Sequence, residues 1–183
     1  SYSGVRPLYD SHQDNPAQVT RDYRLQLNGG KETPPLLSVL GGKVTIYRYL
    51  AEEAMEKLKP SFPGLSDPWT ATVKLPGGNL GGVDFDQYVN NLCARYPEID
   101  AGYLRNLARR HGDLCAQVLG DAKNFNDLGQ DFGCGLYERE VLYMKAHEWA
   151  TTPDDILWRR SKVGLHMSPE ERLRAADGLA AIL

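Results

Sequence analysis

The stretch that decides the fold class is residues 36–60, which read LLSVLGGKVTIYRYLAEEAMEKLKP. Its first five residues form a short apolar run bounded by Gly41-Gly42, the pattern of a buried strand that leads into a tight turn. From Val44 to Leu58 apolar residues recur at helical spacing, and charged residues occupy the opposite face. The stretch therefore predicts a strand, a glycine turn and an amphipathic helix over residues 43–59.

Upstream of this stretch the pattern is that of a hairpin. Tyr23, Leu25 and Leu27 alternate with polar residues, as the residues of a half-buried strand do. The sequence Asn28-Gly29-Gly30 that follows is typical of a turn. We therefore predict that residues 23–27 pair with a second strand.

Downstream, residues 61–83 contain repeated glycine and proline breakers, which predict a crossing segment that Trp69 anchors. Helical periodicity then continues to the end of the chain. Two helix starts are well marked: Thr152-Pro153-Asp154-Asp155, and Ser168-Pro169-Glu170-Glu171, which is a capping box with proline at the first helical position. The predicted helices span residues 85–96, 101–110, 113–119, 135–150, 153–160 and 169–183. The fold class predicted from these patterns is α+β: a short β/α segment followed by a mainly α-helical C-terminal domain.

The composition is that of an ordinary globular chain. Its 183 residues include 21 basic and 24 acidic side chains, a net charge of -3 that excludes a domain-wide nucleic-acid footprint. The three cysteines are widely spaced, which favours free thiols over a disulfide framework. No apolar run approaches the roughly 18 residues of a membrane span. The chain has neither an initiating methionine nor a signal peptide, so we expect a fragment of a larger protein.

The glycine turn, residues 41–45, is a candidate anion site. It is not a P-loop, because that motif needs glycine where Leu37 stands and serine or threonine where Val44 stands. The exposed backbone N–H groups at the start of the following helix nevertheless suit an anion or a negatively polarised ring. The alternative is a tight turn in which the glycines are needed only for steric reasons and no anion binds. Arg6 and Arg21 could likewise pair with a local aspartate or bind a phosphate.

Several motifs together, in this order and at this spacing, resemble one family. The family is that of the FAD-dependent, quinone-linked glycerol-3-phosphate dehydrogenases, in their C-terminal third. The motifs are Gly4-Val5-Arg6-Pro7-Leu8-Tyr9-Asp10, Thr20-Arg21-Asp22-Tyr23, residues 37–48, Glu148-Trp149-Ala150 and residues 155–165. The resemblance covers nearly the whole chain.

The resemblance implies a function in a full-length parent enzyme. That enzyme oxidises glycerol 3-phosphate to dihydroxyacetone phosphate and passes the electrons through FAD to a membrane quinone. Arg6, Arg21 and Lys43 would bind the substrate, with Lys43 beside the reacting carbon as the catalytic residue. Gly41, Gly42, Lys43 and Thr45 would contact FAD. The resemblance implies no metal ligand and no nucleic-acid partner. It is compatible with a homo-oligomer.

The resemblance also implies where the parts of the chain belong. Residues 1–60 would be the C-terminal segment of the FAD and substrate domain, residues 61–83 a linker, and residues 84–183 a helical C-terminal domain. The protein would be cytoplasmic and peripheral at the inner face of a bacterial cytoplasmic membrane. Because no G-x-G-x-x-G follows a strand, the pyrophosphate site would lie outside this chain, and the chain alone would be inactive and not expected to hold FAD.

Two positions depart from the resembled pattern. Ile46 stands where the family usually has threonine, and Tyr49 where it often has a basic residue. Ile46 puts a side-chain hydrogen bond from that position in doubt.

Three other readings remain. His111 and Cys115, four residues apart, could share a metal, but no second pair completes a tetrahedral site. Basic clusters at residues 105–111 and 159–162 could meet lipid headgroups or a partner, although a solvated face with local acidic partners is favoured. Finally, residues 84–183 could form a helical interaction or membrane-contact module with no part in catalysis.

Overall fold

The structure is a computed structural model that describes residues 22–30 and 33–183. By its internal contacts the chain divides into two compact units, the first ending at Val73 and the second running from Lys74 to Leu183. The boundary between them falls within residues 61–83. Among the described residues, no helix is both long and apolar enough to cross a membrane.

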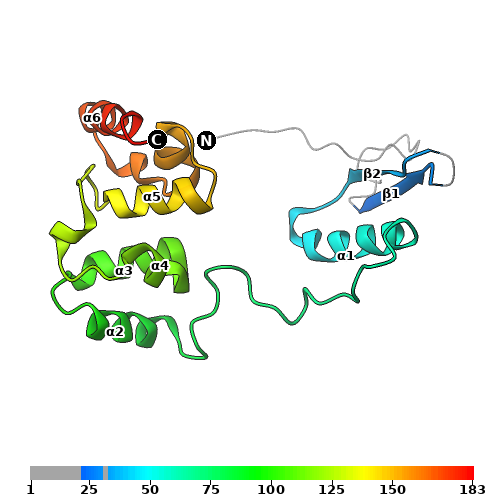
Figure 1. The fold of residues 1–183 in the computed structure, drawn as a ribbon, viewed down its shortest axis with the longest axis horizontal. Helices are drawn as coiled ribbons and strands as arrows, with labels where there is room; N and C mark the ends of the chain where they lie inside the picture. The colour runs from blue at the N-terminus through cyan, green and yellow to red at the C-terminus, as the bar shows by residue number, and fades with distance from the viewer. Residues whose placement is uncertain (1–21, 31–32) are drawn as a thin grey trace, which may run out of the picture. The chain divides into compact units, whose positions relative to one another are not determined.

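The first unit consists of a hairpin and a helix. Strands β1 (Tyr23–Asn28) and β2 (Leu36–Gly41) pair antiparallel, with Tyr23 opposite Gly41 and Asn28 opposite Leu36. The helix α1 (Tyr47–Leu58) follows a 3-10 turn at Val44–Ile46 and lies beside the hairpin (Figure 1). A second 3-10 turn at Lys59–Ser61 ends it. The predicted hairpin and the predicted helix are both confirmed.

The predicted burial of this unit is wrong. None of the residues of β2 or α1 is buried, and Val44 and Tyr47 of the predicted apolar stripe are 86% and 56% exposed. Trp69 is 58% exposed and therefore does not anchor the crossing segment in a core. Apolar spacing specifies which face of an element can be buried, but burial itself needs a covering layer, and within the described part of this unit the hairpin and one helix do not form one.

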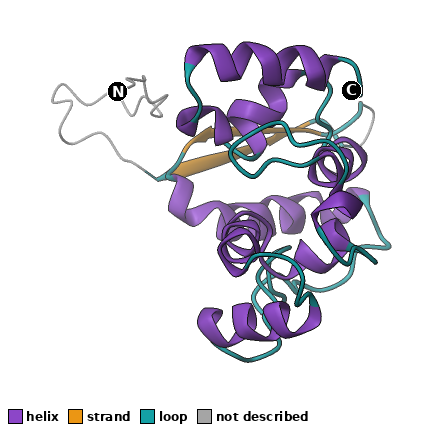
Figure 2. Cartoon of the chain, turned by 90° about the vertical axis from the view of Figure 1, so that its left-hand side faces the viewer, coloured by secondary structure: helices purple, strands orange, loops and turns teal. Residues whose placement is uncertain are grey.

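The second unit contains five α-helices, stacked in layers from α2 to α6 in Figure 1. They are α2 (Phe85–Arg95), α3 (Ala101–His111), α4 (Cys115–Leu119), α5 (Glu138–His147) and α6 (Pro169–Ala180). Short 3-10 turns lie at Gly112–Leu114, Phe125–Leu128 and Val163–His166, and a π-helix spans Asp155–Arg160. Figure 2 shows these helices joined by loops, whereas the strands belong to the hairpin. The α+β fold class with a helical C-terminal part is confirmed.

The helix limits differ from the predicted ones mainly at the ends. The helix predicted over residues 135–150 is shorter, from Glu138 to His147, and the one over 113–119 begins as a 3-10 turn. At Asp155 the predicted cap is present, because its N–H donates to the Thr152 Oγ1 (3.3 Å) and its carboxylate accepts from the Thr152 N–H (3.0 Å). Local capping chemistry therefore marked the start, but it did not decide between α-helical and π-helical winding.

The second unit holds the core of the described chain. Its buried apolar side chains run from Val89 on α2 to Leu179 on α6, and Leu104, Leu107 and Leu136 are fully buried. Residues 76–79, near the start of this unit, pack against the end of α3: the Asp113 N–H donates to the Gly77 carbonyl (3.2 Å). A Cβ at Gly112, where φ is +59°, would lie 1.8 Å from that carbonyl oxygen, so the close approach requires glycine.

The capping box at Ser168 provides a test of this unit. The Ser168 hydroxyl accepts from the Glu171 N–H (3.2 Å), and the Glu171 carboxylate accepts from the Ser168 N–H (2.7 Å). Ser168→Ala is expected to lower the free energy of unfolding by about 0.5–2 kcal/mol. Urea unfolding followed by circular dichroism measures this. Asn90→Ala, on the exposed face of α2, is the control and should stay within about 0.5 kcal/mol.

Candidate functional site

The glycine turn connects β2 to the helix through two residues of positive φ. Gly41 has φ +73° and Gly42 has φ +102°, a region that favours glycine. A Cβ at Gly42 would lie 3.3 Å from the Cβ of Tyr23 and 3.7 Å from the Leu50 side chain. The second glycine thus also lets the turn pass close to β1.

The helix start after this turn is open. Lys43 has extended backbone angles and precedes the 3-10 turn, and no side chain caps it. The Ile46 N–H donates to the Lys43 carbonyl (3.2 Å), while Lys43, Val44 and Thr45 are exposed. Uncapped N–H groups at a helix start offer positive partial charge to an anion. The predicted helix therefore begins with a tighter 3-10 turn.

Of the three predicted substrate-binding side chains, the structure describes one. Arg6 and Arg21 lie outside the described residues, so their predicted convergence with Lys43 stays a prediction. Within the described chain, the Lys43 ammonium is exposed, and it makes no hydrogen bond or ion pair with a described residue. Its charge is therefore available to a ligand.

Beside this turn, a groove of about 590 Å³ lies between β1 and α1. It is lined by Asp22, Tyr23, Arg24, Leu25, Gln26, Ile46, Tyr49, Glu53 and Lys57. The Tyr23 hydroxyl donates to a Glu53 carboxylate oxygen (2.5 Å), and this bond raises the pKa of Tyr23. Ile46 and Tyr49, the two positions that depart from the resembled pattern, both line the groove, which sequence analysis did not predict.

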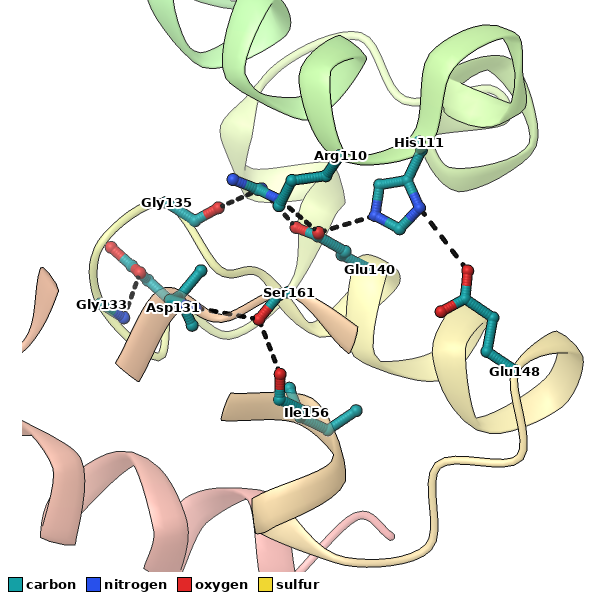
Figure 3. A network of polar contacts seen from close by, with 10 residues as sticks. Arg110, His111, Asp131, Gly133, Gly135, Glu140, Glu148, Ile156 and Ser161 are labelled. Carbon is teal, nitrogen blue, oxygen red and sulfur yellow. Dashed lines mark hydrogen bonds and ion pairs between the residues drawn. The ribbon is translucent and has the colours of Figure 1, made fainter. Parts of the chain in front are cut away.

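A buried polar cluster joins α3 to α5 in the second unit (Figure 3). Glu140 is fully buried and accepts two hydrogen bonds from Arg110, at Nε and at Nη2 (both 2.7 Å). The Nε2 of His111 lies 2.8 Å from the same carboxylate. Arg110 also donates from Nη2 to the Gly135 carbonyl (3.1 Å). The three charged or polar side chains therefore satisfy one another away from water.

The environment of Glu140 favours its charged form. Burial alone would raise the pKa of its carboxyl, but hydrogen bonds from His111 and Arg110, with the positive charge of Arg110, outweigh burial and hold the pKa below its ordinary value. Sequence reasoning missed this residue. The signal was present: Glu140 stands four residues after Leu136 and four before Met144, both fully buried, and a charged residue at such a position needs a partner.

The cluster extends to the end of α5. The Nδ1 of His111 lies 3.8 Å from a carboxylate oxygen of Glu148, the residue that follows α5. Trp149 comes next, with φ +53° and 85% of its surface exposed. A second groove of about 670 Å³ borders this region. Its lining includes Gly77, Phe85, Arg109, His111 and Glu148.

The structure gives no support to a metal shared by His111 and Cys115. The His111 ring is bonded to Glu140, and burial raises the pKa of the Cys115 thiol to about 12. In the parts of the chain that the structure describes, no group of three or more potential ligands could hold a metal ion. All three cysteines are free.

The basic clusters largely have local acidic partners, as favoured from the sequence. Arg105 pairs with Asp86 (2.5 Å), Arg159 with Asp155 (3.1 Å), and Arg110 with the buried Glu140. This interpretation is confirmed for Arg105 and Arg159, but it is wrong for Arg110, whose side chain is mostly buried and whose partner Glu140 is fully buried. The sequence did not show that Arg110 is mostly buried whereas Arg105 and Arg159 are exposed.

Comparisons with known proteins agree along almost the whole chain. The aerobic glycerol-3-phosphate dehydrogenase of Escherichia coli is 44% identical over 98% of this chain and 36% of its own length. The glycerol-3-phosphate dehydrogenase of Pseudomonas aeruginosa is 45% identical over 98% of this chain and 35% of its own length. The D-erythritol 1-phosphate dehydrogenase of Brucella abortus is 42% identical over 94% of this chain and 34% of its own length.

This chain thus spans about a third of the length of these curated relatives. Residues 68–183 match the family described as the C-terminal domain of alpha-glycerophosphate oxidase. That match includes the whole helical unit from Lys74 and more than half of the chain. This chain therefore belongs to the family of proteins that carry the C-terminal domain of alpha-glycerophosphate oxidase.

Proposed function

We propose that this chain is the C-terminal part of an FAD-dependent dehydrogenase that oxidises glycerol 3-phosphate to dihydroxyacetone phosphate and passes the electrons to a membrane quinone. The observation that carries the proposal is identity of 44–45% over nearly the whole chain to two proteins named as glycerol-3-phosphate dehydrogenases. The similarity to a D-erythritol 1-phosphate dehydrogenase supports a polyol phosphate as the substrate class.

The division of labour we propose follows the chain. Residues 1–60 belong to the FAD and substrate domain, residues 61–83 are a linker, and residues 84–183 are the helical C-terminal domain. The absence of buried residues in the hairpin and α1, beside a complete core in the helical unit, supports this division. We place the enzyme at the inner face of a bacterial cytoplasmic membrane, as a peripheral protein.

Phosphate binding is the task proposed for Arg6, Arg21 and Lys43. A phosphomonoester carries about -1.5 to -2 charges near neutral pH and presents three acceptor oxygens. Two forked guanidinium groups and one ammonium match that charge and geometry. The exposed, unengaged ammonium of Lys43 supports its part in this arrangement. Lys43 would also stabilise negative charge that develops on the substrate oxygen during oxidation.

The residues of the glycine turn fit the edge of a flavin. The open helix start at residues 43–45 presents positive partial charge, and the glycines at 41 and 42 allow close approach of the backbone. We assign Gly41, Gly42, Lys43 and Thr45 to FAD contact. When bound, FAD would supply the two-electron acceptor. Ile46 contributes only backbone groups to a polar contact, since its side chain is apolar.

Arg21→Ala in the full-length dehydrogenase tests the phosphate assignment. We expect kcat/KM for glycerol 3-phosphate to fall about 10- to 100-fold, because one charged hydrogen-bonding partner of the phosphate is lost. The FAD content, read from the absorption spectrum of the purified protein, should stay near normal. Loss of FAD would instead assign Arg21 to cofactor binding or folding.

The same enzyme should be assayed with D-erythritol 1-phosphate by dye reduction. A higher kcat/KM for erythritol phosphate than for glycerol 3-phosphate would overturn the choice of substrate but keep the substrate class. The 183-residue chain alone should neither reduce the dye nor retain FAD after gel filtration. A yellow, active preparation of this chain would contradict the proposed division of labour.

A further inference from the structure

Tyr23 connects three parts of the first unit: β1, the glycine turn and α1. It is the first residue of β1 and lies opposite Gly41, the last residue of β2. Its Cβ is 3.3 Å from the position that a Cβ at Gly42 would take, so the side chain starts directly beside the turn. Its hydroxyl donates to a carboxylate oxygen of Glu53 on α1 (2.5 Å). One side chain thus extends from the end of the strand ladder, past the turn, to the helix.

The helix contributes a second contact to the same point of the turn. Leu50 and Glu53 stand three residues apart and therefore lie on one face of α1. The Leu50 Cδ1 is 3.7 Å from the Cβ position at Gly42. Apart from the adjoining residues of the turn, no other described residue has an atom within 4 Å of that position. The packing against this side of Gly42 therefore comes from Tyr23 and from the face of α1 that carries Glu53.

The turn by itself does not set the direction of α1. The strand ladder ends at Gly41, and Gly42 and Lys43 carry the chain from there to a helix start that no side chain caps. Glycine enters the positive-φ region at little steric cost, so the two glycines allow the helix to tilt. Glu53 is six residues after Tyr47, the first residue of α1, or about 9 Å along the helix axis. A hydrogen bond at that distance from the turn limits the tilt of α1 against the hairpin beside it (Figure 1).

We propose that Tyr23 and Glu53 are positioning residues, whose hydrogen bond holds Lys43 and the open helix start at residues 43–45 in place for the reaction. The inference rests on the function proposed for Lys43. No ion pair with a described residue fixes the Lys43 ammonium, so its location depends on the backbone of the turn. Neither Tyr23 nor Glu53 is assigned to substrate or FAD, and both act through Lys43. Placement matters because a displacement of about 1 Å can slow an enzyme about 100-fold.

Four variants of the full-length dehydrogenase separate the hydrogen bond from the other properties of the two side chains. Tyr23→Phe keeps the ring beside Gly42 and removes the hydroxyl that donates to Glu53. Glu53→Ala removes the acceptor. Glu53→Gln removes the charge but keeps an amide oxygen that accepts the same hydrogen bond. Glu56→Ala is the matched control, because Glu56 lies on the same helix and its ion pair, with Lys59 at 3.8 Å, stays within that end of the helix.

Steady-state dye reduction with glycerol 3-phosphate measures the effect. We expect Tyr23→Phe and Glu53→Ala each to lower kcat about 3- to 10-fold, the size of one lost hydrogen bond. KM should change less than about twofold, because the contact that is weakened is one made in the transition state. The double variant should be no slower than either single one, since both remove the same bond. Glu53→Gln and Glu56→Ala should stay within about twofold of the parent enzyme. The FAD content, read from the absorption spectrum, should stay near normal throughout.

Several results would overturn the inference and leave the proposed function intact. One is an active parent enzyme whose kcat is unchanged in Tyr23→Phe and Glu53→Ala. Another is a double variant in which the two losses multiply, since the bond between the side chains would then not be their common cause. A Glu53→Gln enzyme as slow as Glu53→Ala, or an equal loss in Glu56→Ala, would have the same consequence. A parent enzyme that oxidises no polyol phosphate would overturn the proposed function and this inference together.

Discussion

Glu140→Gln is expected to lower the free energy of unfolding of the helical unit by about 3–5 kcal/mol. Glutamine keeps the shape of the side chain, but it removes the charge that balances the partly buried Arg110. The side chain of Arg110 is 17% exposed, and its two hydrogen bonds to Glu140 are 2.7 Å long. Removal of one partner of a buried ion pair leaves the other charge desolvated, and that residual charge accounts for most of the loss.

Urea unfolding at neutral pH, followed by circular dichroism, measures this effect. Asp86→Asn is the matched control, because it also replaces the carboxylate of an arginine ion pair that joins two helices. The difference is exposure, since Asp86 and its partner Arg105 are 74% and 40% exposed. That change should cost no more than about 1 kcal/mol. An equal loss of stability in the two variants would show that burial of Glu140 does not decide its contribution.

The difference in unfolding free energy between the parent chain and Glu140→Gln depends on pH in a defined direction. The pKa of Glu140 is lowered in the folded chain, so its contribution is fully present above the ordinary glutamate pKa of about 4.3. It is lost as the pH falls through the lowered folded pKa. The difference in unfolding free energy between the parent chain and Glu140→Gln should therefore be constant near neutral pH and become smaller in acid.

Lys43→Ala in the full-length dehydrogenase is expected to reduce kcat/KM for glycerol 3-phosphate about 100- to 1000-fold. The reason is the loss of a positive charge placed to meet negative charge on the substrate as it reacts, for which a single preorganised donor has an effect of this size. Because Lys43 makes no ion pair with a described residue, its removal should leave folding unchanged. Dye-reduction kinetics and thermal unfolding of the same preparations separate the two effects.

Lys59→Ala is the control for the removal of an exposed lysine from the same unit. Lys59 lies 3.4 Å from Asp67 and 3.8 Å from Glu56, and these exposed pairs contribute little. Its kcat/KM should stay within about twofold of the parent enzyme, in keeping with a small surface effect. If Lys43→Ala behaves like Lys59→Ala, Lys43 has no catalytic or substrate-binding role.

Local features of the sequence were sufficient to predict the elements of this fold. Alternation in Tyr23, Leu25 and Leu27 before a glycine turn predicted β1, and the pairing with β2 followed from the turn. The capping box at Ser168 predicted the start of α6 at Pro169. Such features act over a few residues, through hydrogen bonds and side-chain spacing that are present whatever surrounds them. Five motifs in a fixed order, residues 4–10, 20–23, 37–48, 148–150 and 155–165, together predicted the family.

Burial and partner choice depended on residues far apart in the chain, and only the tertiary structure decided them. Apolar residues recur at helical spacing in α1, yet α1 has no buried residue whereas Leu104 and Leu107 of α3 are fully buried. The sequence likewise showed Arg105 and Arg110 as one basic cluster. The fold placed Arg105 at the surface with Asp86 and turned Arg110 to the buried Glu140, 30 residues away. Periodicity defines the face that a helix can bury, but the free energy of burial depends on which other elements pack against that face.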